Sequence, residues 1–268
     1  MRCHYLSDLH LESQSFRGTL PHGDVLIIAG DLCHASALDP AQTVPHRVKQ
    51  RERVLRFVSE ATASFRHVLL VPGNHEHYDG VFEDTATLLR RHLPGVTVLD
   101  NEMVDIDGVR FFGTTLWTDL DRRSETSMEK IRRGMGEYFF AKTRSGASER
   151  PAKLRPADTL AAHDRALSEL RREASVGRGA RMVVITHHAP SPQGLNPQHK
   201  GNGLDGAFAS DLEDFIASLS NVPVWIHGHT HIRRRYRIGG TTLLVNCCGF
   251  IGKDLSARKF SPDAYFDL

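Results

Sequence analysis

The fold is decided by the stretch VLLVPGNHEHY, residues 68–78, in which aliphatic side chains give way to a proline, a glycine and a row of polar residues. The apolar run from His67 to Val71 is nearly continuous, as in a strand that is covered on both faces. The motif that follows, Gly73-Asn74-His75-Glu76, would occur by chance only about 0.003 times in a chain of this composition. The stretch therefore predicts a buried strand whose carboxyl end carries functional side chains.

The same arrangement, a β-rich run followed by Gly, Asp or His, recurs along the chain. Residues two apart in an extended segment project to the same side, so we expect Asp8 with His10, and His229 with His231, each to present two ligands to one point. Glycine at the start of a motif lets the backbone turn sharply as it leaves the sheet. The remaining runs and motifs are Arg2–Leu6 with Ser7-Asp8-Leu9-His10, Val25–Ala29 with Gly30-Asp31, Arg181–Thr186 with His187-His188, and Gly228-His229-Thr230-His231.

Helical and hairpin signals separate these strands, which is the pattern of an α/β protein. The turns Asp107-Gly108 and Gly239-Gly240 predict two hairpins, so we expect a layered sandwich with mixed sheets in a single domain, residues 1–268. The irregular, basic stretch Asp119–Pro156 is interpreted as an insertion, either a lid that selects substrates or a solvated basic face. The predicted helices are Val44–Ala63, Val81–His92, Thr159–Glu173 and Phe208–Leu219, and the predicted hairpin strands are Met103–Ile106 with Val109–Gly113 and Arg233–Ile238 with Thr241–Val245.

Composition limits the classes of partner. The 268 residues are 40% hydrophobic, which is enough for a large core. The 34 Lys and Arg against 32 Asp and Glu leave a net charge of +2, which disfavours nucleic acid as a partner. Nothing in the composition indicates a protein partner. No apolar run approaches the roughly 18 residues that span a bilayer, and Met1–Glu12 lacks the apolar stretch of a secretory signal. The four cysteines form no C-x-x-C pair, so we expect reduced thiols. Together with the short apolar runs and the polar N-terminus, this predicts no membrane contact and a cytoplasmic location.

The ordered series D-x-H, G-D, G-N-H-[DE], H and G-H-x-H resembles that of the calcineurin-like metallophosphoesterase superfamily, and it runs from Asp8 to His231. The resemblance implies a four-layer αββα sandwich with a binuclear metal centre in a cleft at the strand ends. It also implies the metal ligands, which are Asp8, His10 and His231 for one metal, Asn74, His187 and His229 for the second, and Asp31 as the bridge between them.

The donor atoms indicate which metals and which chemistry to expect. All are nitrogen or oxygen, which suits two divalent ions, Mn first, with Fe, Zn or Co as alternatives. Two such ions about 3.5 to 4 Å apart lower the pKa of a bridging water and clamp an in-line displacement, so a bridging hydroxide is the expected nucleophile. His75 stands beside Asn74 without being a ligand itself and is the candidate general acid.

Other residues near the motifs have alternative roles. Glu76 either orients His75 or makes a structural hydrogen bond, because adjacent residues in an extended chain point apart. His77, Tyr78 and His34 are candidates to line the cleft.

Particular residues narrow the substrate class within the superfamily. The G-D-x-V-D-R-G segment that the Ser/Thr protein phosphatases share is replaced here by GDLCHAS, residues 30–36, and the lipid-A-pathway pyrophosphohydrolases carry Arg where His75 stands. The double-strand-break nucleases need DNA-binding regions for which this chain leaves little room. A small phosphate ester is therefore the expected partner. The retained histidine favours phosphodiester hydrolysis, with a phosphomonoesterase or nucleotide phosphatase as the runner-up and a non-catalytic metal-binding module as the third alternative.

Overall fold

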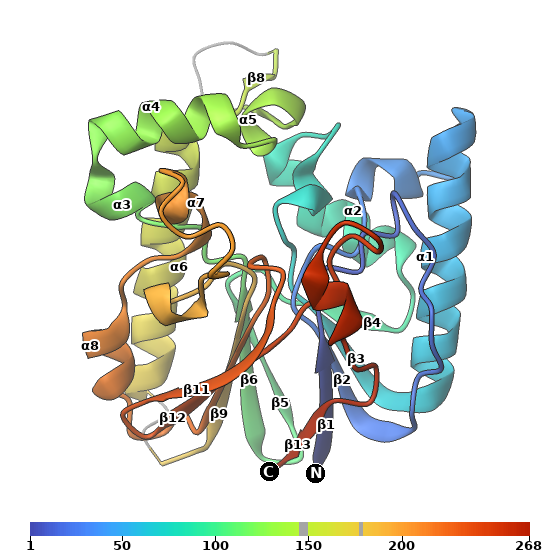
Figure 1. The fold of residues 1–268 in the computed structure, drawn as a ribbon. Helices are drawn as coiled ribbons and strands as arrows, with labels where there is room; N and C mark the ends of the chain where they lie inside the picture. The colour runs from blue at the N-terminus through green and yellow to red at the C-terminus, as the bar shows by residue number, and fades with distance from the viewer. Residues whose placement is uncertain (145–149, 177–178) are drawn as a thin grey trace.

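Two β-sheets face each other at the centre of the molecule, with helices on both outer sides (Figure 1). The computed structural model describes residues 1–144, 150–176 and 179–268. The first sheet consists of β1 (Arg2–Leu6), β2 (Gly23–Ile28), β3 (Phe65–Leu70), β4 (Val96–Val98) and β13 (Tyr265–Asp267). Its strand order is β13-β1-β2-β3-β4, in which β1 to β4 run parallel and β13 is antiparallel to β1.

The second sheet combines parallel inner strands with a hairpin at each edge. It consists of β5 (Glu102–Ile106), β6 (Val109–Thr114), β9 (Met182–Thr186), β10 (Val224–His227), β11 (Arg233–Ile238) and β12 (Thr241–Asn246). The order is β11-β12-β10-β9-β6-β5, and the β5–β6 and β11–β12 pairs are antiparallel. Both predicted hairpins are therefore confirmed.

Alternate residues along a strand face different layers, and this alternation builds the core. Val25 and Ile27 of β2 belong to the apolar cluster between the sheets, together with Phe111 of β6. Leu26 and Ile28 face the opposite layer. Because both faces are buried, the strand reads as an unbroken apolar run.

The outer faces are covered by α1 (Pro45–Ser64), α2 (Thr85–His92), α6 (Pro156–Val176) and α8 (Glu213–Ala217). Phe57 of α1 and Leu89 of α2 pack in the cluster beside the first sheet. Leu170 of α6 and Ile216 of α8 pack with Trp225 of the second sheet. The four layers confirm the predicted αββα sandwich with two mixed sheets.

The predicted helix Phe208–Leu219 is wrong, because the chain is interrupted there. It forms α7 (Asp205–Phe208) and then α8, with an extended connection between them. Ala209 pairs with Ala189 in a β-bridge, and the N–H of Ser210 donates to the carbonyl of Ala189 at 3.1 Å. These backbone bonds hold the connection out of helical geometry.

The insertion predicted at Asp119–Pro156 is more regular than the sequence indicates. It contains α3 (Leu120–Arg123), α4 (Glu125–Gly134), α5 (Glu137–Phe140) and the short strands β7 (Lys142–Thr143) and β8 (Ala152–Lys153). We call residues 119–155 the cap, since Pro156 already begins α6; residues 145–149 lie outside the described part. The cap lies above the carboxyl ends of the inner strands (Figure 1) and has its own apolar cluster, which includes Ile131 and Tyr138.

In the described part of the chain, no helix combines the length and the apolar character that crossing a membrane requires.

Candidate metal centre

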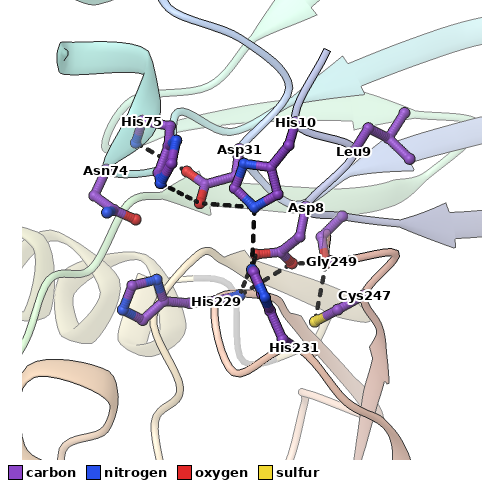
Figure 2. A network of polar contacts seen from close by, with 12 residues as sticks. Asp8, Leu9, His10, Asp31, Asn74, His75, His229, His231, Cys247 and Gly249 are labelled. Atoms are coloured by element: carbon purple, nitrogen blue, oxygen red, sulfur yellow. Dashed lines mark hydrogen bonds and ion pairs between the residues drawn. The ribbon is translucent and has the colours of Figure 1, made fainter. Parts of the chain in front are cut away.

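The carboxyl ends of strands from both sheets bring the polar motifs to one place (Figure 2). Asp8 follows β1, Asp31 follows β2 and Asn74 follows β3, all from the first sheet. His187 follows β9 and His229 follows β10, from the second sheet. The site therefore lies where the two sheets meet.

The ligand-bearing turns have an unusual backbone. Asp8, His10, Asp31, His229 and His231 have φ values of 56°, 48°, 55°, 65° and 47°. Non-glycine residues adopt this left-handed region uncommonly, and strain of this kind is found at functional sites. The motifs are therefore not the extended segments that the sequence argument assumed.

This backbone changes which side chains meet. Asp8 and His10 do converge on one point, with His231 as the third member of the group. The extended-chain expectation is wrong for the other pair, since His229 joins a second group with Asp31 and His187.

The motif glycines serve two needs: Gly30 adopts a positive φ of 85°, as expected for a sharp turn, whereas Gly73 and Gly228 are needed for space. A Cβ at Gly73 would collide with the carboxylate of Asp31, and one at Gly228 would lie 2.7 Å from the carbonyl oxygen of Ala29. Neither of these glycines has a positive φ, so side-chain approach decides their identity.

In the first group, which consists of Asp8, His10 and His231, two imidazole nitrogens face each other. Nε2 of His10 lies 3.0 Å from Nε2 of His231, which lies 3.4 Å from Oδ1 of Asp8. The Nδ1 atoms of the two histidines are engaged by carboxylates, His10 by Glu12 at 2.9 Å and His231 by Asp254 at 2.6 Å. With Nδ1–H donating to a carboxylate, the neutral form of each ring carries its lone pair on Nε2, and both Nε2 atoms face one point, which is the arrangement a cation requires.

The second group repeats the pattern. Nδ1 of His187 donates to the carbonyl of Ala29 at 2.9 Å, so the neutral ring carries its lone pair on Nε2. That Nε2 faces Oδ1 of Asn74 at 3.0 Å, Nδ1 of His229 at 3.2 Å and Oδ1 of Asp31 at 3.3 Å. Four acceptor-type atoms around one point fit a divalent cation with nitrogen and oxygen ligands.

Asp31 lies between the two groups. Its Oδ1 faces His187, and its Oδ2 lies 3.9 Å from Nε2 of His10. The backbone N–H of His75 donates to Oδ1 at 2.9 Å, which fixes the carboxylate. One oxygen toward each group is the geometry of a bridging ligand.

The protein's own charges make the site attract cations. Burial would lower the pKa of His231, but the Asp254 and Asp8 carboxylates outweigh it and raise this pKa to about 10. Burial is likewise outweighed at His187, where Asp31 and Asp8 raise the pKa to about 9. Burial would raise the pKa of Asp8, but His231 lowers it to about 2. Protons on these histidines therefore occupy the positions that a metal would take.

His75 faces the same point from the side of the first group. Its Nδ1 lies 3.0 Å from Oε1 of Glu12, its Nε2 lies 3.9 Å from Oδ2 of Asp31, and its ring stacks on Tyr78 with centroids 4.4 Å apart. Burial would lower the pKa of His75, but Asp31 and Glu12 raise it to about 9. The side chain remains 19% exposed and so can reach a bound substrate.

Glu76 does not contact the His75 side chain. Its carboxylate is buried and accepts hydrogen bonds from the backbone N–H groups of Asp31, Leu32, Cys33 and Gly73, at 2.6 to 3.1 Å. Of the two roles considered for Glu76, the structure therefore shows the structural hydrogen bond, made to the turn that carries Asp31.

Of the three residues expected to line the cleft, Tyr78 and His34 lie near His75 or the donor groups, and His77 points away from them. Tyr78 lines the cleft, and its hydroxyl accepts a hydrogen bond from Nδ2 of Asn74 at 3.0 Å. His34 lies beside His75, with ring centroids 6.1 Å apart, and pairs with Asp79 at 3.4 Å. His77 points away from the metal donors, since its Nδ1 bonds Thr85 at 2.8 Å and its ring stacks on Phe82.

The sequence argument did not identify three carboxylates that contact residues of the candidate site: Glu12, Asp254 and Glu137. Glu12 and Asp254 hydrogen-bond His10 and His231, and buried Glu137 of the cap lies 3.5 Å from Nδ2 of Asn74. Only Glu12 left a usable signal, because it continues the i, i+2 spacing of Asp8 and His10. Asp254 and Glu137 come from segments that the motifs do not include.

The chain is similar to known proteins over most of its length. The family model for calcineurin-like phosphoesterases matches residues 1–233. An uncharacterized protein of Acanthamoeba polyphaga mimivirus is 23% identical over 236 residues, which cover 80% of this chain and 78% of that protein.

A solved structure shows the same fold. Phosphopantetheinyl hydrolase from Mycobacterium tuberculosis superimposes with a TM-score of 0.61 at 17% identity, covering 95% of this chain and 93% of that one. A putative 5'-nucleotidase from Staphylococcus aureus has a TM-score of 0.44 at 15% identity, covering 91% of this chain and 48% of that one.

Proposed function

The chain belongs to the calcineurin-like phosphoesterase family, and from that premise we propose that it hydrolyses small phosphate esters, phosphodiesters above all, at a centre of two divalent metal ions. The observation that carries the proposal is the carboxylate of Asp31, which turns one oxygen toward each of two groups of nitrogen and oxygen donors. A single structural metal would need one such group.

The proposed ligands follow the two groups. Asp8, His10 and His231 hold one ion, Asn74, His187 and His229 hold the other, and Asp31 bridges them. Manganese is the first metal to test, followed by iron, zinc and cobalt, because the donor set lacks thiolates. When bound, two such ions polarise a phosphoryl oxygen and lower the pKa of the attacking water.

The side chains around the ions supply orientation and a proton. The carboxylates of Glu12 and Asp254 fix the imidazole rings, so the ligand geometry is set before a substrate arrives. His75 is the proposed general acid, since its own surroundings favour the protonated form and its Nε2 lies 3.9 Å from Asp31. A proton delivered to the leaving oxygen lets a poor alkoxide leaving group depart.

Phosphodiester hydrolysis is proposed ahead of phosphomonoester hydrolysis. In either reaction an alkyl ester releases an alkoxide whose oxygen must be protonated, and His75, which faces the donor groups from one side, would supply that proton. The rates on the two kinds of ester therefore decide between them. Four free, buried cysteines agree with a reducing compartment, so the cytoplasm remains the proposed location.

The test is turnover by the full chain loaded with manganese. We expect hydrolysis of bis(p-nitrophenyl) phosphate to exceed that of p-nitrophenyl phosphate, with two metal ions per chain by elemental analysis. Asp31→Asn, which removes the bridging charge, should lower kcat by about 10² or more. Asp214→Asn, at an exposed carboxylate on α8, is the matched control and should leave the rate unchanged.

Each alternative gives a different result. Faster turnover of the monoester would favour the phosphomonoesterase. Two bound ions with no turnover of either ester under any of the four metals would favour a non-catalytic metal-binding module. A single ion in fully active protein would contradict the bridge.

A further inference from the structure

A cavity of about 340 Å³ opens directly above the metal-donor groups. Its floor is formed by His75 and by four of the proposed ligands, Asp31, Asn74, His229 and His231. Its walls come from elements outside the motifs: Met135 of the cap, Leu195 and Leu204 of the loop after β9, Phe208 of α7, and Phe250 of the loop after β12. These five wall residues are apolar, and a phosphate group alone would not need them. Polar residues of the same loop and of the start of α7 also line the cavity: Asn196, His199, Lys200, Asn202 and Asp205.

Packing between the cap and the loop fixes the apolar wall. A Cβ at Gly134 would lie 2.9 Å from Cδ2 of Leu204, so the cap backbone rests directly on that leucine. Ala207 is buried in the cap's own apolar cluster together with Met135. The wall is therefore already formed by the folded chain.

Two aromatic rings are also fixed in place. Phe250 stacks on His10 with ring centroids 4.1 Å apart and an interplanar angle of 17°, and Phe208 stacks on His229 at 4.7 Å and 27°. Each ring thus lies against a histidine of one donor group, and both rings remain partly exposed in the cavity.

We propose that this cavity binds an apolar ester group of the substrate, of about the size of an aromatic ring, while the phosphate lies on the floor. Preformed pockets that combine apolar walls with a few convergent polar groups bind small organic ligands in this way. The inference rests on the proposed function for the position of the phosphate, and it adds the chemical class of the group attached to it.

The test compares two phosphonates that share the charged head and differ in the attached group. Phenylphosphonate and methylphosphonate are titrated calorimetrically into manganese-loaded protein. We expect phenylphosphonate to bind about 10-fold more tightly, because burial of the additional apolar surface contributes about 25 cal/mol per Å². The ratio of the two dissociation constants reports the apolar contact, since effects on the metals cancel.

Variants locate the contact. Met135→Ser and Leu204→Ser, tested separately, should each reduce the ratio to about 3 or less and leave methylphosphonate binding unchanged. Two variants are used because loss of Leu204 could loosen the cap. Phe139→Ser is the matched control, since Phe139 lies on the cap with 49% exposure and does not line the cavity, and it should keep the full ratio.

The outcomes separate this inference from the proposed function. Equal affinities in protein that turns over bis(p-nitrophenyl) phosphate would overturn the inference alone. A ratio that both variants keep would overturn the assignment to this cavity. No binding of either phosphonate, together with no turnover, would overturn the inference and the proposed function together.

Discussion

Glu12 holds two histidines that have different proposed tasks. Its Oε1 atom bonds Nδ1 of the proposed ligand His10 at 2.9 Å and Nδ1 of the proposed acid His75 at 3.0 Å. Its Oε2 atom is buried without a hydrogen-bond partner. One carboxylate therefore sets the distance between a metal ligand and the proton donor.

The role of His75 can be separated from metal binding by substitution. His75→Ala should retain both metals and lose about 10² to 10⁴ in rate on a diester with an alkyl leaving group, the usual contribution of a positioned general acid. The loss should be smaller on a nitrophenyl ester, because nitrophenoxide departs without protonation. Steady-state rates on both esters, with metal content measured in parallel, give the comparison.

His34→Ala is the matched control for this prediction. His34 lies beside His75 but pairs with Asp79, so its removal should change neither the metal content nor the leaving-group dependence. An equal loss on both esters in His75→Ala would mean that the residue mainly positions the phosphoryl group, and a lost metal would mean that it is a ligand.

At the scale of elements, the buried strands were predictable because their surroundings leave a simple pattern. Arg2–Leu6 is predicted with the observed bounds, and the run predicted at Arg181–Thr186 begins one residue early. Central parallel strands are apolar on both faces, so length and turn residues delimit them. The Asp107-Gly108 turn fixes a hairpin in the same direct way.

Elements held by distant contacts were not predictable. The break between Phe208 and Glu213 depends on backbone bonds to Ala189, about twenty residues earlier in the chain, which no local pattern records. The cap forms short helices because its apolar residues, Ile131 among them, pack on α6, although its composition resembles a loop.

The candidate site, too, was predictable in part: its polar residues could be read from the sequence, but their grouping and the apolar wall could not. The motifs name its polar residues, but the grouping of His229 apart from His231 follows from left-handed backbone that sequence spacing does not reveal. The apolar wall is also absent from the motifs, since Leu204 and Met135 meet only in the folded chain.

One side chain of the cap reaches the proposed metal centre. Glu137 of α5 is buried, and burial raises its pKa. Its carboxyl group accepts a hydrogen bond from the Tyr78 hydroxyl at 3.3 Å and lies 3.5 Å from Nδ2 of Asn74. These contacts turn Oδ1 of Asn74 toward His187.

Glu137→Ala should therefore weaken binding of one of the two metals by about 10- to 100-fold, the usual cost of losing a group that orients a ligand. Glu137→Gln keeps an oxygen atom that can accept from Tyr78 and Asn74, and it should stay within about threefold of the wild type. Metal titration of the two variants, followed by calorimetry, measures the difference.

Glu129→Ala tests whether any loss of charge from the cap has this effect. Glu129 is exposed on α4, where it pairs only with Arg132 and Arg133 among the described residues, so metal binding should be unchanged. Equal metal affinity in Glu137→Ala and the wild type would show that Asn74 is oriented without the cap.

At the scale of the whole molecule, the proposed metal centre takes its ligands from both halves of the sandwich. The first sheet supplies Asp8, Asp31 and Asn74, and the second supplies His187 and His229, from segments up to 221 residues apart. The unfolded chain cannot present these ligands together. Bound metal is therefore expected to stabilise the contact between the sheets.

Metal loading should raise the thermal midpoint of unfolding accordingly. At a free metal concentration of 100 times Kd, each site adds about 2.7 kcal/mol, or roughly 5 to 10 °C for a chain of this size. Calorimetric scans with manganese and with a chelator measure the difference, and Asp31→Asn should reduce it.

The dependence of this difference on pH distinguishes the proposed ligands from an adventitious site. Without metal, the pKa of His187 is raised to about 9 and that of His231 to about 10, so both protonated side chains stabilise the folded state. This contribution is complete below about pH 6.5 and is lost as the pH rises through 9 to 10. Metal requires neutral imidazoles and must displace those protons, so its affinity rises over the same range. The gap between the two midpoints should therefore widen from pH 6 to pH 9. A gap that stays constant would mean that these histidines do not bind the metal.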